Sequence, residues 1–268
     1  MTARINRNTQ LCMSLSARPG NFGTRFQNHL FEALGLDYVY KAFTTTDIEG
    51  AVRGIRALGI RGCAVSMPFK EAVIPLIDEL DPSAASIGAV NTIVNDGGHL
   101  KGYNTDYLAV VQLMQRHQVP TDTRWALAGA GGMAKAVASA LVDYDYANGT
   151  IVARNAAKRA ELADRLGIAH ANTAPEGTQM LVNATPIGMA GGAEADALPF
   201  PTESIAAAEI VFDVVAIPPE TPLIRAARDA GREVITGDAV LVLQGREQFV
   251  LYTGVQPGRA EVEAAARV

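Results

Sequence analysis

The sequence is short of several residue types, and each shortage argues against a class of protein. Cysteine occurs only twice in 268 residues, at Cys12 and Cys63, and without Cys-x-x-Cys spacing. We therefore expect two free thiols in a reducing compartment rather than a disulfide. Acidic residues outnumber basic ones by 28 to 23, the net charge is −5, and no stretch is rich in Lys or Arg. This charge balance argues against a nucleic-acid partner.

Long apolar runs are also missing from the chain. No stretch approaches the roughly 18 uninterrupted apolar residues of a membrane-spanning helix. The N-terminal segment, MTARINRNTQ, lacks the apolar core of a signal peptide. The sequence therefore predicts a soluble, cytoplasmic protein with no membrane partner.

Apolar residues, in contrast, make up 49% of the chain and charged residues only 19%, which is enough for a sizeable core. The length suits two medium domains. Strand-like and helix-like segments alternate, and this order predicts an α/β fold. We expect strands over 9–15, 38–43, 60–66, 90–95, 100–103, 124–128, 150–153, 179–183, 210–215 and 233–236. We expect helices over 21–35, 47–58, 70–80, 105–117, 155–166, 221–230, 239–251 and 257–266. The strands after residue 124 are apolar runs, as expected for a parallel sheet covered on both faces.

A glycine-rich turn follows the apolar run 125–128 and precedes an Ala-rich helix. In this context Gly129 permits a tight turn, Gly131 lets the backbone approach a pyrophosphate, and the small Ala134 allows close helix–strand packing. Backbone N–H groups at the helix start would face the phosphates. The pattern predicts a dinucleotide site formed by Gly129, Ala130, Gly131, Gly132, Met133 and Ala134.

The residues after the next strand indicate which dinucleotide binds. NAD-binding folds place an acid about 20 residues past the glycines to bond the ribose 2′-hydroxyl, but no acid lies between Asp145 and Glu161. Arg154 offers a planar fork for a 2′-phosphate, and Lys158 or Arg159 adds charge. The alternative is a solvated basic helix start, which is disfavoured because cations are poorly placed at a helix N-terminus unless an anion is there. We therefore predict NADP.

Short motifs recur along nearly the whole chain in a characteristic order. They are Ser14-Leu15-Ser16, Val65-Ser66-Met67-Pro68-Phe69-Lys70, Gly88-Ala89-Val90-Asn91-Thr92, Asn104-Thr105-Asp106, the glycine turn, Asn183-Ala184-Thr185-Pro186-Ile187-Gly188-Met189, Pro218-Pro219-Glu220-Thr221-Pro222-Leu223 and Gln244-Gly245. This order resembles the shikimate dehydrogenase family. The resemblance implies a substrate domain over 1–103 and 239–268, with the C-terminal helices returning to it, and a Rossmann NADP-binding domain over 104–238. It also implies the reversible reduction of 3-dehydroshikimate to shikimate, in aromatic amino-acid biosynthesis.

The resemblance assigns the proton-transfer pair to Lys70 and Asp106. Lys70 would take the proton of the substrate hydroxyl as hydride leaves for the nicotinamide, and Asp106 would bind substrate hydroxyls and orient Lys70. The helix expected from residue 70 disfavours a purely structural lysine, because a cation there opposes the helix dipole. Asp106 has a simpler alternative role, since Asp is a favourable residue at a helix start.

Further residues are expected to hold the substrate and cofactor. Ser14 and Ser16 lie two apart on a strand, so both hydroxyls point to one face and can hold a carboxylate; an exposed strand end is the alternative. The resemblance adds Asn91 as the partner of a ring hydroxyl and Gln244 as a residue that reaches back to the substrate, and a polyol acid needs such convergent polar groups. It also adds Thr185 and Gly237 to the cofactor site. No metal is implied.

The chain departs from the family where the family touches substrate. The usual Asn-Val-Thr is Ala64-Val65-Ser66, which removes an amide and keeps a hydroxyl at Ser66. A usual Tyr is Ala216, and the turn over 17–27 is longer. We therefore expect a shikimate dehydrogenase-like enzyme with weak or altered substrate preference. Quinate or an amino-shikimate-like acid is an alternative substrate. A non-catalytic NADP-binding sensor and, less favoured, a methylene-folate-type dehydrogenase are alternative functions. A monomer and a homodimer both remain open.

Overall fold

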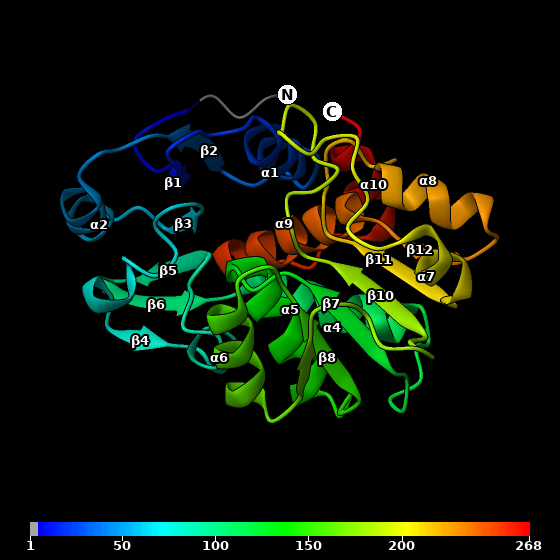
Figure 1. The fold of residues 1–268 in the computed structure, drawn as a ribbon. Helices are drawn as coiled ribbons and strands as arrows, with labels where there is room; N and C mark the ends of the chain where they lie inside the picture. The colour runs from blue at the N-terminus through cyan, green and yellow to red at the C-terminus, as the bar shows by residue number, and fades with distance from the viewer. Residues whose placement is uncertain (1–4) are drawn as a thin grey trace. The chain divides into compact units, whose positions relative to one another are not determined.

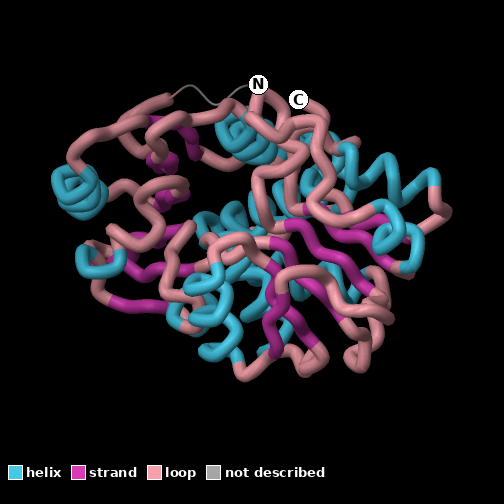
Figure 2. Tube along the Cα trace, in the orientation of Figure 1, coloured by secondary structure: helices cyan, strands magenta, loops and turns pink. Residues whose placement is uncertain are grey.

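A computed structural model describes residues 5–268. The chain divides into two compact units, one that ends at Thr105 and resumes at Val242, and one that spans Asp106–Leu241. Strands and helices alternate in both units (Figures 1 and 2). The predicted α/β class is confirmed. The boundaries expected after residues 103 and 238 lie close to those of the units, while the assignment of one unit to substrate and the other to cofactor stays a prediction.

The first unit is built on a mixed sheet of six strands among the described residues, in the order β2-β1-β3-β5-β6-β4. Strands β1, β2 and β3 are parallel, whereas β5 is antiparallel to β3 and forms a hairpin with β6. Gly97 and Gly98 turn this hairpin with φ of 60° and 99°, a region that favours glycine. The strands are β1 (Gln10–Leu15), β2 (Tyr38–Phe43), β3 (Gly62–Val65), β4 (Glu79–Leu80), β5 (Thr92–Asp96) and β6 (His99–Tyr103).

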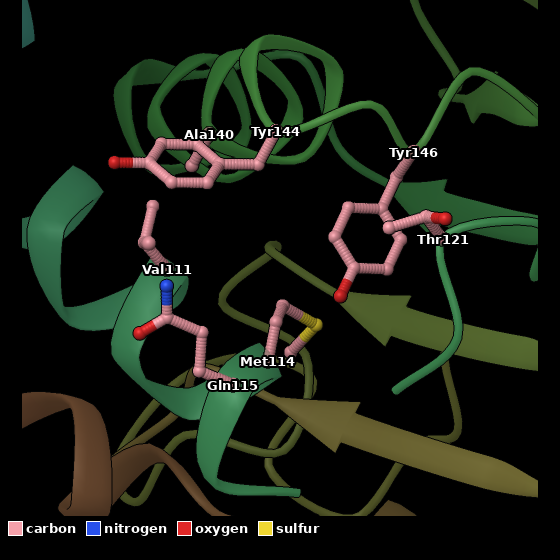
Figure 3. Close-up of a pocket in the computed structure, with 7 residues that line it drawn as sticks. All are labelled: Val111, Met114, Gln115, Thr121, Ala140, Tyr144 and Tyr146. Carbon is pink, nitrogen blue, oxygen red and sulfur yellow. The ribbon is translucent and has the colours of Figure 1, made fainter. Parts of the chain in front are cut away.

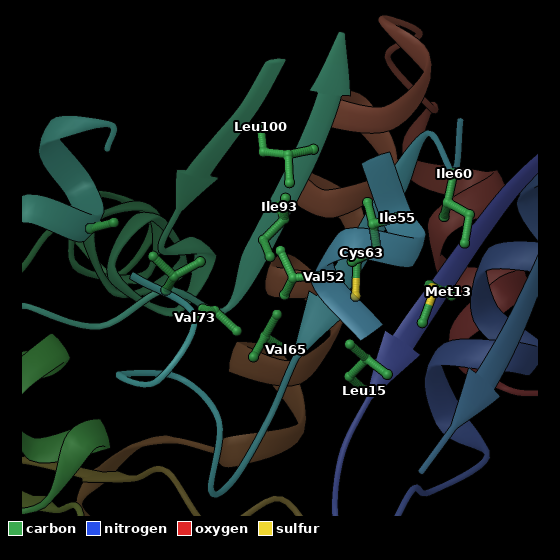
Figure 4. Close-up of a cluster of buried hydrophobic side chains, with 12 residues drawn as sticks. Met13, Leu15, Val52, Ile55, Ile60, Cys63, Val65, Val73, Ile93 and Leu100 are labelled. Carbon is green, nitrogen blue, oxygen red and sulfur yellow. The ribbon is translucent and has the colours of Figure 1, made fainter. Parts of the chain in front are cut away.

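The two faces of this sheet carry separate hydrophobic cores, and the two cysteines lie one on each. Cys63 belongs to the core shown in Figure 4, with Leu15, Ile55 and Ile93. Cys12 belongs to the opposite core, which includes side chains of α1, α9 and α10. Both thiols are free, as predicted, and both are buried. Their placement on opposite faces rules out a bond between them without a change of fold.

The described helices of the first unit are α1 (Phe22–Ala33), α2 (Ile48–Ala57), the short α3 (Pro82–Ala85) and α10 (Arg259–Ala266). Helices α1, α2 and α10 lie on predicted segments, whereas α3 was not predicted. Asp47 caps α2 by accepting a hydrogen bond from the N–H of Gly50. The helix expected over 70–80 is wrong. The chain there forms turns and a 3₁₀ helix, η1 (Ile74–Leu76), before β4. Pro75 explains the difference, since it lacks an N–H donor and disfavours α backbone in the residue before it. The dipole argument for Lys70 therefore does not hold.

The second unit contains a parallel sheet of six strands within Asp106–Leu241, in the order β12-β11-β10-β7-β8-β9. This confirms the expected parallel sheet, and the apolar strands are buried as predicted. The strands are β7 (Trp125–Ala128), β8 (Gly149–Val152), β9 (Ala169–Ala171), β10 (Met180–Asn183), β11 (Ile210–Asp213) and β12 (Glu233–Ile235).

Four helices lie wholly within the described residues of this unit, and α4 begins one residue before it at Thr105. They are α4 (Thr105–Arg116), α5 (Gly132–Asp143), α6 (Ala156–Leu166), α7 (Thr202–Ala207) and α8 (Pro222–Asp229). Asn155 caps α6 and Thr221 caps α8. Helix α9 (Gly237–Thr253) begins in the second unit and ends in the first. Within residues 5–268, no helix combines the length and apolarity needed to cross a membrane.

Candidate active site

The glycine turn between β7 and α5 has the predicted geometry. Gly129 has φ of 124°, and a Cβ on it would lie 2.8 Å from the carbonyl oxygen of Ala184. A side chain at Gly129 is therefore excluded by both backbone conformation and space. Ala134 is fully buried, and its Cβ would be 3.4 Å from that added Cβ. The small residue at position 134 permits this close approach of helix and strand.

The next two glycines have a different environment. A Cβ added to Gly131 or Gly132 would meet no described atom within 4 Å, so the protein's own packing does not demand glycine there. The first backbone N–H groups of a helix lack partners within the helix, and α5 starts at Gly132. Open space beside these N–H groups suits an anionic ligand such as a pyrophosphate. The residues present therefore fit a dinucleotide.

Arg154 lies just after β8 and is paired within the second unit. Its two terminal nitrogens lie 3.1 Å from the two carboxylate oxygens of Glu194, although the Arg154 side chain is 80% exposed. The anion at this helix start is thus the protein's own carboxylate, which sequence reasoning did not foresee. A 2′-phosphate would compete with Glu194 for the same guanidinium fork.

The two other cations near Arg154 differ from each other. Lys158 has an exposed side chain, and its backbone N–H donates to Oδ1 of the capping Asn155. Arg159 donates to the carbonyl of Ala153 at 3.0 Å and to Asn172 Oδ1 at 2.7 Å. Arg159 therefore joins α6 to the chain on either side of it, and Lys158 remains the candidate for a second cation.

A buried polar network follows β10 and β11. Asp213 is fully buried and accepts hydrogen bonds from Thr221 Oγ1 at 2.6 Å, Asn183 Nδ2 at 2.9 Å and the N–H of Val215 at 3.0 Å. Burial raises the pKa of Asp213, although these hydrogen bonds oppose the rise. Thr185 donates to Asn183 Oδ1 at 2.6 Å. The network fixes the loop that carries the predicted cofactor residue Thr185, and its hydroxyl already has an internal acceptor.

Gly237 is required by packing at the start of α9. A Cβ there would lie 2.4 Å from the carbonyl carbon and oxygen of Val215. This approach places Gly237 against the segment that follows Asp213 and contains Ala216. Its assignment to the cofactor stays a prediction.

In the first unit, backbone hydrogen bonds gather several of the predicted substrate residues. The N–H of Ser66 donates to Leu15 at 2.9 Å, and the N–H of Ala17 donates to Met67 at 3.2 Å. These bonds bring Ser66 beside the end of β1, which carries Ser14 and is followed by Ser16. Ser14 is hydrogen-bonded to the buried Tyr40 phenol, and Ser16 Oγ accepts from the N–H of Arg18 at 3.1 Å.

Lys70 and Asn91 are joined to the same region. The N–H of Val90 donates to the carbonyl of Lys70 at 2.8 Å, which places Lys70 beside the segment that carries Asn91. Asn91 is 1% exposed. Its Oδ1 accepts from the N–H of Thr105 at 2.8 Å, from Thr105 Oγ1 at 3.1 Å and from Thr92 Oγ1 at 2.8 Å. Its Nδ2 has no hydrogen-bond partner among the described residues.

Two other predicted residues lie on helices. Asp106 is the second residue of α4 and is 1% exposed. Lys70 and Asp106 belong to different units, so their action as a pair stays a prediction. Gln244 is half-buried on α9, beside Gly245, whose carbonyl accepts from Gln27 Nε2 at 2.8 Å. This bond fixes the part of α9 that carries Gln244 against α1.

A cavity of about 190 Å³ lies elsewhere, within the second unit between α4 and α5 (Figure 3). Figure 3 shows the side chains around it, which are Val111, Met114, Gln115, Thr121, Ala140, Tyr144 and Tyr146. None of these lining residues is a carboxylate or an amine, and the Tyr146 hydroxyl donates to the carbonyl of Val119. The cavity therefore has no lining carboxylate or amine and shares no residue with the predicted site. Among residues 5–268, no cluster of three or more His, Cys, Asp or Glu side chains is arranged for a metal ion.

The chain is similar in sequence to known proteins over almost its whole length. Residues 22–93 match the family model of the shikimate dehydrogenase substrate binding domain. A shikimate dehydrogenase-like protein of Haemophilus influenzae is 51% identical, over 98% of this chain and 97% of its own length. A shikimate dehydrogenase (NADP(+)) of Pelodictyon phaeoclathratiforme is 37% identical, over 88% of each chain.

Solved structures show the same fold. That of a shikimate 5-dehydrogenase-like protein matches with a TM-score of 0.95 at 51% identity and covers 98% of each chain. Shikimate 5-dehydrogenase of Thermus thermophilus, solved with NADP(H) and shikimate, has a TM-score of 0.86 at 29% identity and covers 96% of this chain and 98% of its own. Quinate dehydrogenase of Corynebacterium glutamicum, solved with NAD, has a TM-score of 0.87 at 27% identity and covers 96% and 97%. Proteins named for different substrates therefore share this architecture.

Proposed function

The chain belongs to the shikimate dehydrogenase family of oxidoreductases, and on that premise we propose that it interconverts 3-dehydroshikimate and shikimate with NADP. In this proposal, residues 1–103 and 239–268 bind the substrate, and residues 104–238 bind the cofactor. Relatives named shikimate dehydrogenase (NADP(+)) and the related structure with NADP(H) and shikimate support it.

The observation that carries the proposal is the buried Nδ2 of Asn91. Its partner atom Oδ1 is held by three hydrogen bonds, so the amide is fixed and Nδ2 is left without an acceptor among the described residues. Such an unpaired buried donor costs about 1–3 kcal/mol, and a ligand hydroxyl that accepts its hydrogen removes that cost. In the proposal, Asn91 binds a ring hydroxyl, Ser14 and Ser16 bind the carboxylate, and Ser66 and Gln244 bind the remaining polar groups.

Proton transfer in the proposal depends on two residues. When bound, the nicotinamide cofactor accepts the hydride in oxidation and supplies it in reduction. Lys70 takes the hydroxyl proton as the alcohol is oxidised and returns a proton to the carbonyl oxygen as the ketone is reduced. Asp106 accepts hydrogen bonds from substrate hydroxyls and orients Lys70.

The cofactor assignment is supported by the space beside Gly131 and Gly132. In the proposal, the turn from Gly129 to Ala134 holds the pyrophosphate, and Arg154 with Lys158 holds the 2′-phosphate. Thr185 and Gly237 complete the site.

Turnover by the purified chain tests the proposal. Shikimate and NADP should generate reduced cofactor, which is followed by its absorbance. Lys70→Ala should abolish turnover while NADP affinity stays nearly unchanged; full turnover by Lys70→Ala would show that the acid/base assignment is wrong. NADP binding without turnover of any of a panel of cyclohexene and cyclohexane carboxylates would favour a non-catalytic sensor instead.

Quinate is the second candidate substrate. Ala64 and Ala216 remove polar side chains that the family motif carries at these positions, and a quinate dehydrogenase shares the fold. Comparing kcat/KM for shikimate and quinate, each with NADP and with NAD, separates these possibilities.

A further inference from the structure

A row of polar side chains crosses one face of the first unit's sheet. Ser14 on β1 and Thr92 on β5 are both register partners of Ala64 on β3. The shikimate dehydrogenase motif has Asn in place of Ala64. This chain therefore lacks an amide in the middle of the row, on the face where Ala64 packs with Phe249 and Tyr252 of α9.

Helix α9 provides another amide beside this gap. Gln248 is only 5% exposed, and its Nε2 donates to Thr92 Oγ1 at 3.1 Å. Thr92 is fully buried and is itself a neighbour of Ala64. The amide that is missing from β3 at residue 64 is thus matched by a buried amide on α9 at residue 248, 184 residues later in the chain.

The hydrogen-bond donors and acceptors among Gln248, Thr92 and Asn91 can be assigned. A Thr hydroxyl has one hydrogen to donate, and Thr92 Oγ1 lies 2.8 Å from Asn91 Oδ1. Thr92 Oγ1 donates to Asn91 Oδ1 and accepts from Gln248 Nε2, and it also lies 3.4 Å from Thr105 Oγ1, where either hydroxyl can be the donor. The donation to Asn91 favours the amide orientation in which Oδ1 faces Thr92 and Nδ2 faces away.

We infer that Gln248 is a positioning residue that acts through Thr92 to orient the Asn91 amide, and that it replaces the amide lost at Ala64. The inference rests on the proposed function only in assigning a substrate hydroxyl to Asn91 Nδ2. Thr105 also holds Asn91 Oδ1, so removal of Gln248 weakens the orientation without abolishing it.

Gln248→Met tests the inference, because Met has a similar length but cannot donate a hydrogen bond. The loss of one net hydrogen bond corresponds to a roughly 2- to 13-fold effect, so KM for the hydroxy acid that is turned over should rise by that factor, with kcat and NADP affinity nearly unchanged. Ala64→Asn combined with Gln248→Ala should restore KM by returning the amide to β3. Thr253→Val is the matched control, because its hydroxyl lies on the same helix but is hydrogen-bonded to backbone groups, the carbonyl of Phe249 and the N–H of Val255, and KM should not change.

NMR measures the orientation of the Asn91 side-chain amide in the absence of substrate. The side-chain amide resonance of Asn91, identified by its loss in Asn91→Ser, should shift in Gln248→Met and not in Thr253→Val. If Gln248→Met does not fold, the Ala64→Asn, Gln248→Ala protein provides the comparison, and its Asn91 resonance should match the wild type. An unmoved resonance in Gln248→Met, or no rescue by Ala64→Asn, would overturn the inference. A shifted resonance in a protein that binds no hydroxy acid would uphold the positioning and count against the proposed function.

Discussion

The pairing of Arg154 with Glu194 makes a quantitative prediction about cofactor choice. Glu194 occupies both arms of the guanidinium that we assign to the 2′-phosphate, so the phosphate has to displace it. An exposed ion pair contributes about 0.2–1 kcal/mol. With an RT of about 0.59 kcal/mol, this energy corresponds to a factor of about 1.4 to 5 in affinity. Glu194→Gln should therefore raise NADP affinity by that factor. NAD affinity should stay the same because NAD has no 2′-phosphate.

Calorimetric titration with NADP, NAD and 2′,5′-ADP measures this effect. Glu220→Gln is the matched control, since Glu220 forms a similar exposed pair with Arg228 at 3.2 Å, and it should leave all three affinities unchanged. Arg154→Ala should weaken NADP and 2′,5′-ADP alone. Unchanged NADP affinity in Glu194→Gln would refute the competition. A fall in NAD affinity would show instead that Glu194 binds a ribose hydroxyl.

Three further predictions concern the fold around the site. Cys12 and Cys63 should not react with a thiol reagent in the native protein and should both react in guanidinium, because burial raises the pKa of each, that of Cys12 to about 12; rapid native labelling would contradict their burial. Gly131→Ala should fold normally but lose NADP affinity, whereas Gly129→Ala should lose about 1 kcal/mol or more of stability in urea unfolding; equal stability of both variants would contradict the assigned roles. The pKa of Asp213 is raised above its ordinary 3.8, so folding favours its protonated form. The stability of the wild type relative to Asp213→Asn should therefore fall as pH rises from 3.8 through the raised pKa. A stability difference that grows with pH over this range would contradict the predicted direction.

Local sequence patterns were sufficient where short-range chemistry decides the structure. The glycine turn and the apolar parallel strands were predicted because their causes lie within a few neighbouring residues. The helix expected over 70–80 was wrong although the cause is also local, because Pro75 lies inside that segment and disfavours an α-helix there.

Contacts between distant parts of the chain were not predictable in the same way. Arg154 and Glu194 are 40 residues apart, and Thr92 and Gln248 are 156 apart, so their pairing depends on how strands and helices fold together. Gln248 did have one local indication, a polar residue beside Phe249 on a buried stretch of α9. Its partner could be identified only after the register of β3 and β5 was known.

The path of α9 has a consequence for the order in which the protein is made. The second unit is continuous in the chain, from Asp106 to Leu241, so all of it has been synthesised while part of the first unit is still missing. Until α9 is synthesised, the core around Cys12 lacks Phe249 and Tyr252, and Gln27 lacks its acceptor at Gly245. The strands of the parallel sheet therefore all precede the helix that covers the first sheet, and the face of that sheet that carries Ser14 and Thr92 stays uncovered until α9 has formed.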